Sequence, residues 1–481
     1  MPNAPETDDL TAPGGAAVSW RAGEPAPEAP PSLGGAAMTA VVVLPAASLS
    51  APGEILAWRD RAGGTVVRVA LGLAAGEPSL VAEVKMDARE EPLRLSMPLR
   101  ALPGATARVV GLRLAADKLD LFVDGVRVDE EWPLGGLAAP GGALGIGSAT
   151  RVRLWGRGLS DAEIVGLSGG AAGLAAREDD LLGPEAPVGQ YWLPRGFNVN
   201  VGDCMPFFEG GRFHLFYLHN RRSHMSRWGL GGHEWAHLST TDLLHWDRHP
   251  IAVPLTRGDE GSICTGSVFF HNGVYHAFYA VRTVDRSASP ICASTSRDCV
   301  HFVKHPTLAV LGPPYRPEDG RDPVVFRDAT TGLFHMLLTT GLADCPAGAE
   351  GGCLAELVSG DLQTWEQRGP FIVPGLPGQP ECPDAFEWRG WHYLLFSNGG
   401  VTRYRMSRGP LGPWERPGVD VFGGPDVMVM KTAAFTGDRR IGAAFTRGEG
   451  YGGRLVLREI LQNSDGTLVS AWPPELTPPF P

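Results

Sequence analysis

The sequence predicts an all-β protein in which a five-bladed β-propeller follows a β-sandwich of the jelly-roll type. Short strand-like segments alternate with turns along the chain, which has 64 Gly and 42 Pro among its 481 residues. A hairpin unit recurs from residue 190 onward, and a second unit that ends on an aromatic residue recurs between its copies. A repeat of about 50 residues made of strands is typical of propeller blades, whereas helical arrays repeat at about 33 to 34 residues.

The first third of the chain predicts an arm and a sandwich. Residues 1–35 are rich in Pro, Ala and Gly and lack periodicity, so we expect a flexible arm. Residues 36–170 contain short strands, and Asp124-Gly125 stands where a two-residue hairpin turn belongs. Ser160, with Glu163 three residues later, predicts the start of a capped helix.

The segments LDLFVDGVRV and RLWGRGLSDAEI of this domain resemble concanavalin-like domains of the laminin-G type. The resemblance implies a jelly roll that binds glycans, or one that packs against the second domain; the sequence leaves both roles open. A Gly-, Ala- and acid-rich linker is expected over residues 171–189, and the propeller over residues 190–481.

The propeller prediction depends on two repeated units. The hairpin unit occurs as GGRFHLFYL, NGVYHAFYA, TGLFHMLLT, RGWHYLLFS and GDRRIGAAF. The aromatic residues of the second unit are Trp246, Phe302, Trp365 and Trp414. Each period therefore supplies four strands, and five periods predict five blades.

Three acids, Asp203, Asp322 and Glu381, stand eight to ten residues ahead of a hairpin glycine, at nearly the same phase of the repeat. In a propeller this phase lies at one mouth of the central channel, where Thr265 and Lys431 or a near neighbour are expected to complete a ring. A single Asp at this phase is explained by capping of a strand. Three together predict a carboxylate cluster of the kind that glycoside hydrolysis requires.

Several segments in order resemble glycoside hydrolase family 32, the β-fructofuranosidases, whose clan includes families 68 and 43. They are GDCMPFFEGGRFHLFY with Asp203, WAHLSTTDLLHW from Trp235, Thr265-Gly266-Ser267, Arg321-Asp322-Pro323 and ECPD from Glu381. The resemblance spans about 290 residues. It implies a retaining hydrolase that cleaves a terminal β-fructofuranoside such as sucrose or a fructan.

The resemblance also implies the roles of the site residues. Asp203 is the expected nucleophile, Glu381 the general acid and base, and Asp322 the acid that stabilises the transition state. A general acid of this kind is kept protonated by burial and by like-charged neighbours. The predicted substrate-binding residues are Arg321, Thr265, Ser267, His219, Trp228, His233, Trp235 and Asn200.

The sequence departs from the family pattern around the nucleophile. Gly202 replaces the Asn that precedes it, Leu218-His219 replaces a Gln, and Cys264 replaces a Phe. Residues at these positions bind the terminal fructosyl unit in the family, so the identity and linkage of the sugar stay open. Fructosyl transfer, an arabinan-type pentofuranosidase and a non-catalytic carbohydrate-binding propeller are the alternatives.

Other features have simpler interpretations. His233-Glu234-Trp235-Ala236-His237 matches the HExxH zinc motif, but its Gly-rich and aromatic surroundings favour a strand over the helix that this motif requires. Arg221, Arg222 and His224 form either a solvated loop or a site for an anionic or multiply hydroxylated leaving group. We expect neither a cofactor nor a metal.

Composition sets further limits. The net charge of −11 argues against nucleic acid as a partner, and no apolar run reaches the length of a membrane span. The N-terminus shows no secretory signal, so we expect a cytoplasmic protein whose seven cysteines are reduced, although Cys345 and Cys353 lie close enough in sequence to be bridged. The expected partner is an oligosaccharide or small furanoside, and the oligomeric state, a homo-oligomer included, stays open.

Overall fold

The computed structural model describes residues 18–25, 37–102, 106–115, 118–138, 142–345, 351–448 and 450–477. The chain divides into two compact units, the first being Met1–Glu185 with Arg195–Asn198 and the second Ala186–Pro194 with Val199–Pro481. The predicted arm lies largely outside the described residues. Where it is described, the prediction was wrong for Val18–Arg21, because this segment pairs with Arg151–Leu154 as an edge strand.

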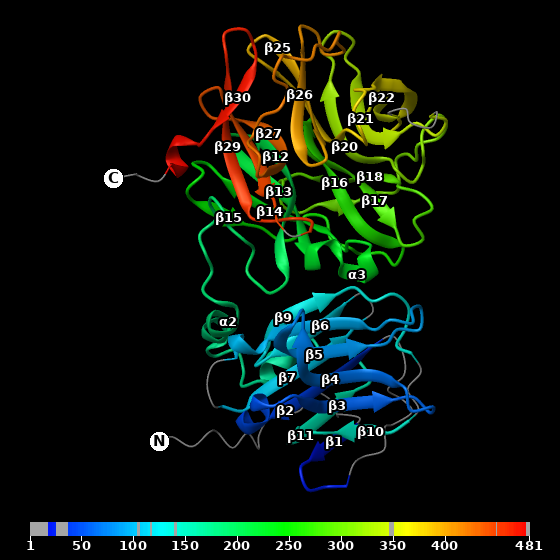
Figure 1. The fold of residues 1–481 in the computed structure, drawn as a ribbon, viewed down its shortest axis with the longest axis vertical. Helices are drawn as coiled ribbons and strands as arrows, with labels where there is room; N and C mark the ends of the chain where they lie inside the picture. The colour runs from blue at the N-terminus through cyan, green and yellow to red at the C-terminus, as the bar shows by residue number, and fades with distance from the viewer. Residues whose placement is uncertain are drawn as a thin grey trace. The chain divides into compact units, whose positions relative to one another are not determined.

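The first unit is a sandwich of two antiparallel sheets (Figure 1). In order across the first sheet the described strands are β1 (Val18–Arg21), β11 (Arg151–Trp155), β2 (Met38–Leu44), β7 (Arg108–Leu114), β8 (Leu119–Val123) and β9 (Val126–Glu131). Across the second they are β10 (Leu144–Ile146), β3 (Gly53–Arg59), β4 (Thr65–Ala74), β5 (Glu77–Val84) and β6 (Leu93–Pro98). Burial alternates along β6, whereas β2 and β8 are buried at nearly every position.

Local sequence signals in this unit are confirmed. Val123 pairs with Val126 across Asp124-Gly125, and both turn residues have positive φ, as a type I′ turn requires. Ser160 caps helix α1 (Asp161–Leu167), and its hydroxyl and Glu163 form a reciprocal capping box. The segment predicted as a linker contains a second helix, α2 (Leu174–Leu182).

The second unit consists of five successive antiparallel sheets (Figure 1). The first sheet contains β12 (Val199–Glu209), β13 (Arg212–Arg221), β14 (Glu234–Thr240) and β15 (Trp246–Arg248). The second contains β16 (Glu260–His271), β17 (Val274–Thr283), β18 (Ile291–Ser296) and β19 (Val303–Lys304). The third contains β20 (Arg321–Arg327), β21 (Phe334–Gly341), β22 (Gly352–Ser359) and β23 (Glu366–Ile372). The fourth sheet contains β24 (Glu381–Trp388), β25 (Trp391–Asn398) and β26 (Val401–Ser407). The fifth contains β27 (Val427–Phe435), β28 (Arg439–Thr446), β29 (Leu455–Gln462) and β30 (Leu468–Ala471). A short helix, α3 (Ser226–Gly229), follows β13.

The first strands of these sheets contact one another in a closed ring, from β12 through β16, β20, β24 and β27 back to β12. The all-β propeller architecture predicted from the repeats is thus confirmed. One detail was wrong: among the described residues, the sheet that begins at β24 has three strands, and only single bridges such as Arg403 to Val421 take the place of a fourth. Apolar side chains of the first and last sheets share a core, which includes Phe213, Phe435 and Leu457.

A register shift interrupts the pairing of every inner strand at the same place. It falls between Val201 and Cys204 in β12, and the matching shifts lie in β16, β20, β24 and β27. Each shift inserts one extra residue, which is the definition of a β-bulge, and bulges turn side chains toward new directions. Asp322, Cys382 and Val429 occupy equivalent bulge positions and all have positive φ, which is unusual for residues with a side chain.

Candidate active site

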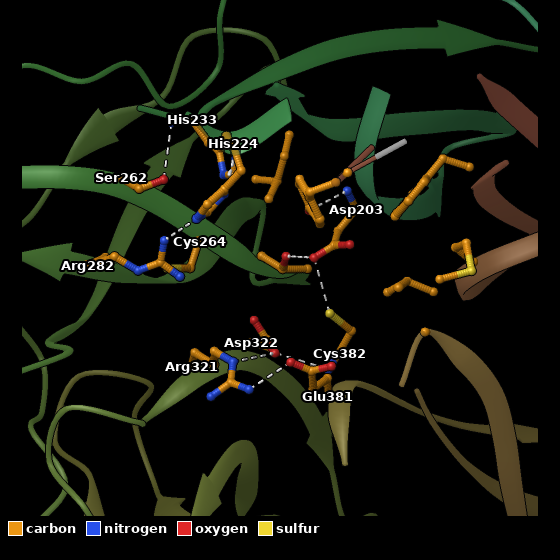
Figure 2. Close-up of a pocket in the computed structure, with 18 residues that line it drawn as sticks. Asp203, His224, His233, Ser262, Cys264, Arg282, Arg321, Asp322, Glu381 and Cys382 are labelled. Atoms are coloured by element: carbon orange, nitrogen blue, oxygen red, sulfur yellow. Dashed lines mark hydrogen bonds and ion pairs between the residues drawn. The ribbon is translucent and has the colours of Figure 1, made fainter. Parts of the chain in front are cut away.

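The bulges open onto a cavity of about 380 Å³ in the second unit (Figure 2). Six of the predicted site residues line it: Asp203, His233, Thr265, Arg321, Asp322 and Glu381. They come from different inner strands and from the segment before β14, so residues far apart in sequence meet in one place. Figure 2 shows the three carboxylates facing a common space, with Arg321 beside Asp322 and Glu381.

The three acids do not share one position of the repeat, as their spacing had suggested. Glu381 is the last paired residue before its bulge, Asp322 is the first bulge residue of β20, and Asp203 is the second bulge residue of β12. They therefore stand at three consecutive positions. The bulge changes the direction of each strand here, and side chains at successive positions can face one cavity.

Asp203 is 8% exposed, and its two carboxylate oxygens have different surroundings. Oδ2 accepts hydrogen bonds from the Thr265 hydroxyl at 2.5 Å and from the Cys382 thiol at 3.4 Å. Among the described residues, no donor has hydrogen-bond geometry to Oδ1. Oδ2 is thus held in place by hydrogen bonds, whereas Oδ1 is left available to a molecule bound in the cavity.

Burial, with a further contribution from the nearby Asp322, raises the pKa of Asp203 to about 6, although hydrogen bonds from Thr265, Cys382 and Tyr451 act in the opposite direction. The sequence predicted a raised pKa for the general acid, whereas the structure gives a raised pKa to Asp203, the predicted nucleophile. At pH 7 this carboxyl is mostly ionised, as a nucleophile must be.

This pKa predicts a stability effect. A carboxyl whose pKa is higher in the folded than in the unfolded state destabilises the fold once pH rises through the folded pKa. We expect Asp203→Asn to raise the free energy of unfolding by about 3 kcal/mol at pH 8, and the gain to vanish near pH 4, because two pKa units correspond to that energy. Urea unfolding across this pH range measures it.

Asp242→Asn is a control of opposite sign for this measurement. Hydrogen bonds from the side chain and backbone of His245 lower the pKa of Asp242, so its carboxylate favours the folded state above its usual pKa. This variant should lose stability at high pH. Equal responses of the two variants would contradict the assigned burial of the Asp203 charge.

Arg321 links the other two acids. Its guanidinium donates to Glu381 Oε1 at 2.8 Å, and its Nε lies 3.6 Å from Asp322 Oδ2. Asp322 Oδ2 also accepts from the Thr339 hydroxyl at 3.0 Å and from the backbone amide of Cys382 at 3.1 Å. Although burial alone lowers the pKa of Arg321, Asp322 and Glu381 outweigh it and the net shift is upward, so the cation is permanent.

Cys382 lies between the carboxylates. Burial raises the pKa of its thiol well above the usual value, and the charges of Asp203, Asp322 and Glu381 act in the same direction. The sulfur therefore stays protonated and serves as a donor to Asp203. All seven cysteines are free thiols, Cys345 and Cys353 included, in accord with the expectation of reduced cysteines.

Five other predicted substrate-binding residues do not line this cavity. Trp235 is fully buried, and its indole donates to the backbone oxygen of Cys264 at 2.9 Å, so it packs within the sheets. Asn200 accepts a hydrogen bond from Asn220. The three that remain outside are Ser267, His219 and Trp228.

Lys431 also lies outside the predicted ring. Its ammonium donates to the backbone oxygen of Gly266 at 2.8 Å, and with Ser267 it lines a second cavity between the middles of the inner strands. Met428 and Val429 line the site cavity from β27 instead. The prediction of Lys431 or a near neighbour was thus right for the neighbours and wrong for Lys431, because the bulge in β27 cannot be recognised from its apolar sequence.

Other residues of the cavity were not predicted from the sequence. Tyr451 contacts Asp203, and Arg282 donates to His224 Nε2 at 2.7 Å on the side away from the acids (Figure 2). Burial, together with the charges of Arg282 and Arg286, lowers the pKa of His224 to about 4, so this imidazole is neutral. Of the polar loop Arg221, Arg222 and His224, only His224 lines the cavity.

The HExxH segment is not a zinc-protease site, because Glu234–Thr240 forms strand β14 rather than a helix. Among the described residues, one group has metal-ligand atoms close enough to hold an ion: His214, His237 and Cys299, all within 4.8 Å. The two imidazoles instead hydrogen-bond each other at 3.0 Å, and none of the three lines the site cavity.

Residues 204–409 match the model of the glycosyl hydrolases family 32 N-terminal domain. The second unit belongs to glycosyl hydrolase family 32. Sucrose-6-phosphate hydrolase of Escherichia coli is 28% identical over 299 residues, covering 54% of this chain and 58% of the relative. Raffinose invertase of Escherichia coli is 28% identical over 318 residues, covering 59% of this chain and 63% of the relative. The chain thus spans less than two thirds of these family 32 relatives.

A solved structure supports the fold of this family 32 unit. A variant of fructan 1-exohydrolase IIa from Cichorium intybus, in complex with 1-kestose, has a TM-score of 0.50 and 18% identity over 60% of each chain. Asp203 precedes the matched region by one residue, and Tyr451 lies beyond it. In the part of the chain that the structure describes, no helix is long and apolar enough to cross a membrane.

Proposed function

We propose that the protein is a retaining glycoside hydrolase that cleaves a terminal β-fructofuranoside. Asp203 is the nucleophile, Glu381 the general acid and base, and Asp322 the acid that holds sugar hydroxyls. The observation that carries the proposal is the Oδ1 atom of Asp203, which has no donor among the described residues and belongs to a cavity shared with Glu381 and Asp322. Membership of family 32 supports the furanoside class.

The first step forms a covalent intermediate. An electron pair of Asp203 Oδ1 attacks the anomeric carbon while the bond from this carbon to the leaving-group oxygen breaks. The proton of Glu381 goes to the departing oxygen, which leaves as a neutral hydroxyl. The Thr265 and Cys382 donors hold Asp203 Oδ2, so the carboxylate keeps its orientation as Oδ1 becomes an ester oxygen.

The second step reverses these roles. Glu381, now a carboxylate, takes a proton from water, and the water oxygen attacks the anomeric carbon. The bond to Asp203 breaks and the carboxylate is restored. Two inversions give net retention of configuration. If a sugar hydroxyl replaces water, the same groups transfer the fructosyl unit.

Arg321 and Asp322 support both steps. Arg321 holds Glu381 Oε1 at 2.8 Å and so fixes the acid at the edge of the cavity, where its side chain is 40% exposed. Asp322 is held by Thr339 and by the Cys382 amide on Oδ2, which leaves its other oxygen for sugar hydroxyls. Such bonds strengthen as charge develops on the sugar ring.

The stereochemistry of the product tests this function. NMR spectra recorded at the start of hydrolysis should show the β-anomer of fructose released from sucrose or a fructan oligosaccharide. Release of the α-anomer first would refute the covalent mechanism. Activity on arabinofuranosides alone would favour the pentofuranosidase, and sugar binding without turnover would favour a carbohydrate-binding propeller.

A phosphorylated leaving group is a second candidate for substrate class, supported by a basic cavity next to the site. Arg282 and His224 line both cavities, and Arg286 and Glu318 line the second one. Among the described residues, neither Arg282 nor Arg286 forms an ion pair with a carboxylate. Guanidinium groups bind phosphate through paired charge-assisted hydrogen bonds. The sucrose-6-phosphate hydrolase of Escherichia coli is among the relatives of this chain.

We expect Arg286→Gln to raise KM for sucrose 6-phosphate by about tenfold and to leave KM for sucrose unchanged, because one charge-assisted hydrogen bond is worth about 1.5 kcal/mol or more. Steady-state kinetics with both sugars measures the difference. Arg297→Gln, an exposed arginine outside both cavities, is the matched control. An equal change in KM for sucrose 6-phosphate and for sucrose in Arg286→Gln would refute recognition of a phosphate by this cavity.

A further inference from the structure

The bulge of β12 differs from the other four at one position. The first bulge residue contributes a side chain to the cavity in β16, β20, β24 and β27; these residues are Cys264, Asp322, Cys382 and Val429. In β12 the residue at this position is Gly202. The residue directly before the proposed nucleophile therefore leaves a space that its own strand does not fill.

Tyr451 fills this space from another part of the chain. A Cβ atom on Gly202 would lie 3.0 Å from the Tyr451 hydroxyl and 3.0 Å from Leu218 Cβ. Contacts this close are rare for a Cβ atom, so a side chain at position 202 would require Tyr451 or Leu218 to shift. The hydroxyl accepts a hydrogen bond from the backbone amide of Asp203 at 3.0 Å. The absence of a side chain at Gly202 thus leaves room for the Tyr451 hydroxyl to reach the Asp203 amide.

The segment that carries Tyr451 is fixed to the strand of the nucleophile. Val201 and Gly453 exchange backbone hydrogen bonds of 2.9 and 2.8 Å. The backbone oxygen of Tyr451 accepts from Asn220 Nδ2 at 2.8 Å. Its ring packs at 5.6 Å from Phe445 and 5.5 Å from His233, measured between ring centroids. The hydroxyl therefore has little freedom to move.

We propose that Tyr451 is a positioning residue that takes the place of a side chain at position 202, holds the backbone of Asp203 and stabilises its carboxylate. This inference rests on the proposed role of Asp203. Burial and the charge of Asp203 raise the pKa of the Tyr451 hydroxyl well above its usual value, so the hydroxyl keeps its proton while it accepts from the amide. That proton favours the charged form of Asp203.

The expected effect is a change in pH dependence. The titratable groups that face Asp203 are Asp322, Cys204, Cys382 and Tyr451. In the wild type, kcat/KM should fall as pH drops through about 6, because Asp203 becomes protonated. Tyr451→Phe removes the hydroxyl that accepts from the Asp203 amide and favours the Asp203 charge, so this acidic limb of the pH profile should move up by about one pH unit. Maximal kcat should fall about tenfold, with KM unchanged.

Two control variants separate positioning from packing. Tyr217→Phe removes the hydroxyl of a buried tyrosine in β13, the strand that pairs with β12. Among the described residues this tyrosine makes no hydrogen bond to Asp203, so the variant should leave the acidic limb in place. Gly202→Ala should displace the Tyr451 hydroxyl and produce the same upward shift. In the double variant with Tyr451→Phe, the shifts should not add, because both changes break one contact.

A measurement without turnover separates this inference from the proposed function. The difference infrared spectrum of wild type and Asp203→Asn reports protonation of this carboxyl directly. An upward shift of the titration in Tyr451→Phe supports the positioning contact even if no furanoside is cleaved, an outcome that would refute the function alone. An unchanged titration and an unchanged kinetic limb in Tyr451→Phe would overturn the inference.

Discussion

Asp203→Asn is expected to lower kcat/KM on a terminal β-fructofuranoside by roughly 10⁴- to 10⁶-fold, the range seen when the nucleophilic machinery of a hydrolase is removed. The amide cannot form the glycosyl ester, and no other carboxylate occupies the second bulge position of an inner strand: the equivalents are Thr265, Pro323, Pro383 and Met430. Steady-state rates with sucrose and a fructan oligosaccharide measure the loss.

Loss of the fold cannot produce this result, because the same substitution is expected to raise stability at pH 8. Unfolding curves and hydrolysis rates measured on one preparation of Asp203→Asn should therefore change in opposite directions: stability increases while activity is lost. Asp203→Asn with wild-type activity would mean that another residue attacks the sugar, or that none does.

Glu381→Gln is expected to lower kcat by about 10² to 10⁴-fold on sucrose-like substrates, because proton transfer to the leaving oxygen is lost. The loss should depend on the leaving group. An aryl fructoside, whose leaving group needs no proton, should still form the covalent intermediate. This intermediate should then accumulate, because the variant lacks the general base that activates water for the second step. A burst of released phenol followed by a slow steady rate is the expected signal.

Azide, which needs no general base, should restore the second step in Glu381→Gln and give a fructosyl azide. Glu387→Gln is the matched control, since Glu387 lies on the same strand, is exposed and does not line the site cavity. An equal loss on sucrose and on the aryl fructoside would contradict the acid and base role of Glu381.

The sequence predicted those parts of the fold that depend on local signals. Turn residues such as Asp124-Gly125 and the cap at Ser160 work within a few residues, so their outcome is independent of the rest of the chain. The hairpin repeat predicted the propeller because identical units can bury their faces only against one another. Strand β1 was missed because its pairing with β11 is long-range and its sequence resembles a loop.

The site was predicted as residues but not as geometry. Repetition identified Asp203, Asp322 and Glu381, yet the bulges that bring them together have no common sequence, since Gly202, Asp322 and Cys382 share a position. Trp235 was expected in the cavity but is buried, because an aromatic residue in a motif satisfies packing as readily as binding. Tyr451 reaches the site from a connection after β28, and its only signal in the sequence is the missing side chain at Gly202.

Mass spectrometry tests the covalent intermediate on Asp203 most directly. Glu381→Gln is mixed with an aryl fructoside, quenched with acid during the burst and digested. We expect the peptide that contains Asp203 to gain the mass of one fructosyl unit, with fragment ions that place it on this residue. The double variant Asp203→Asn/Glu381→Gln should show no such gain. A label on another residue, or a burst with no labelled peptide, would contradict a covalent intermediate on Asp203.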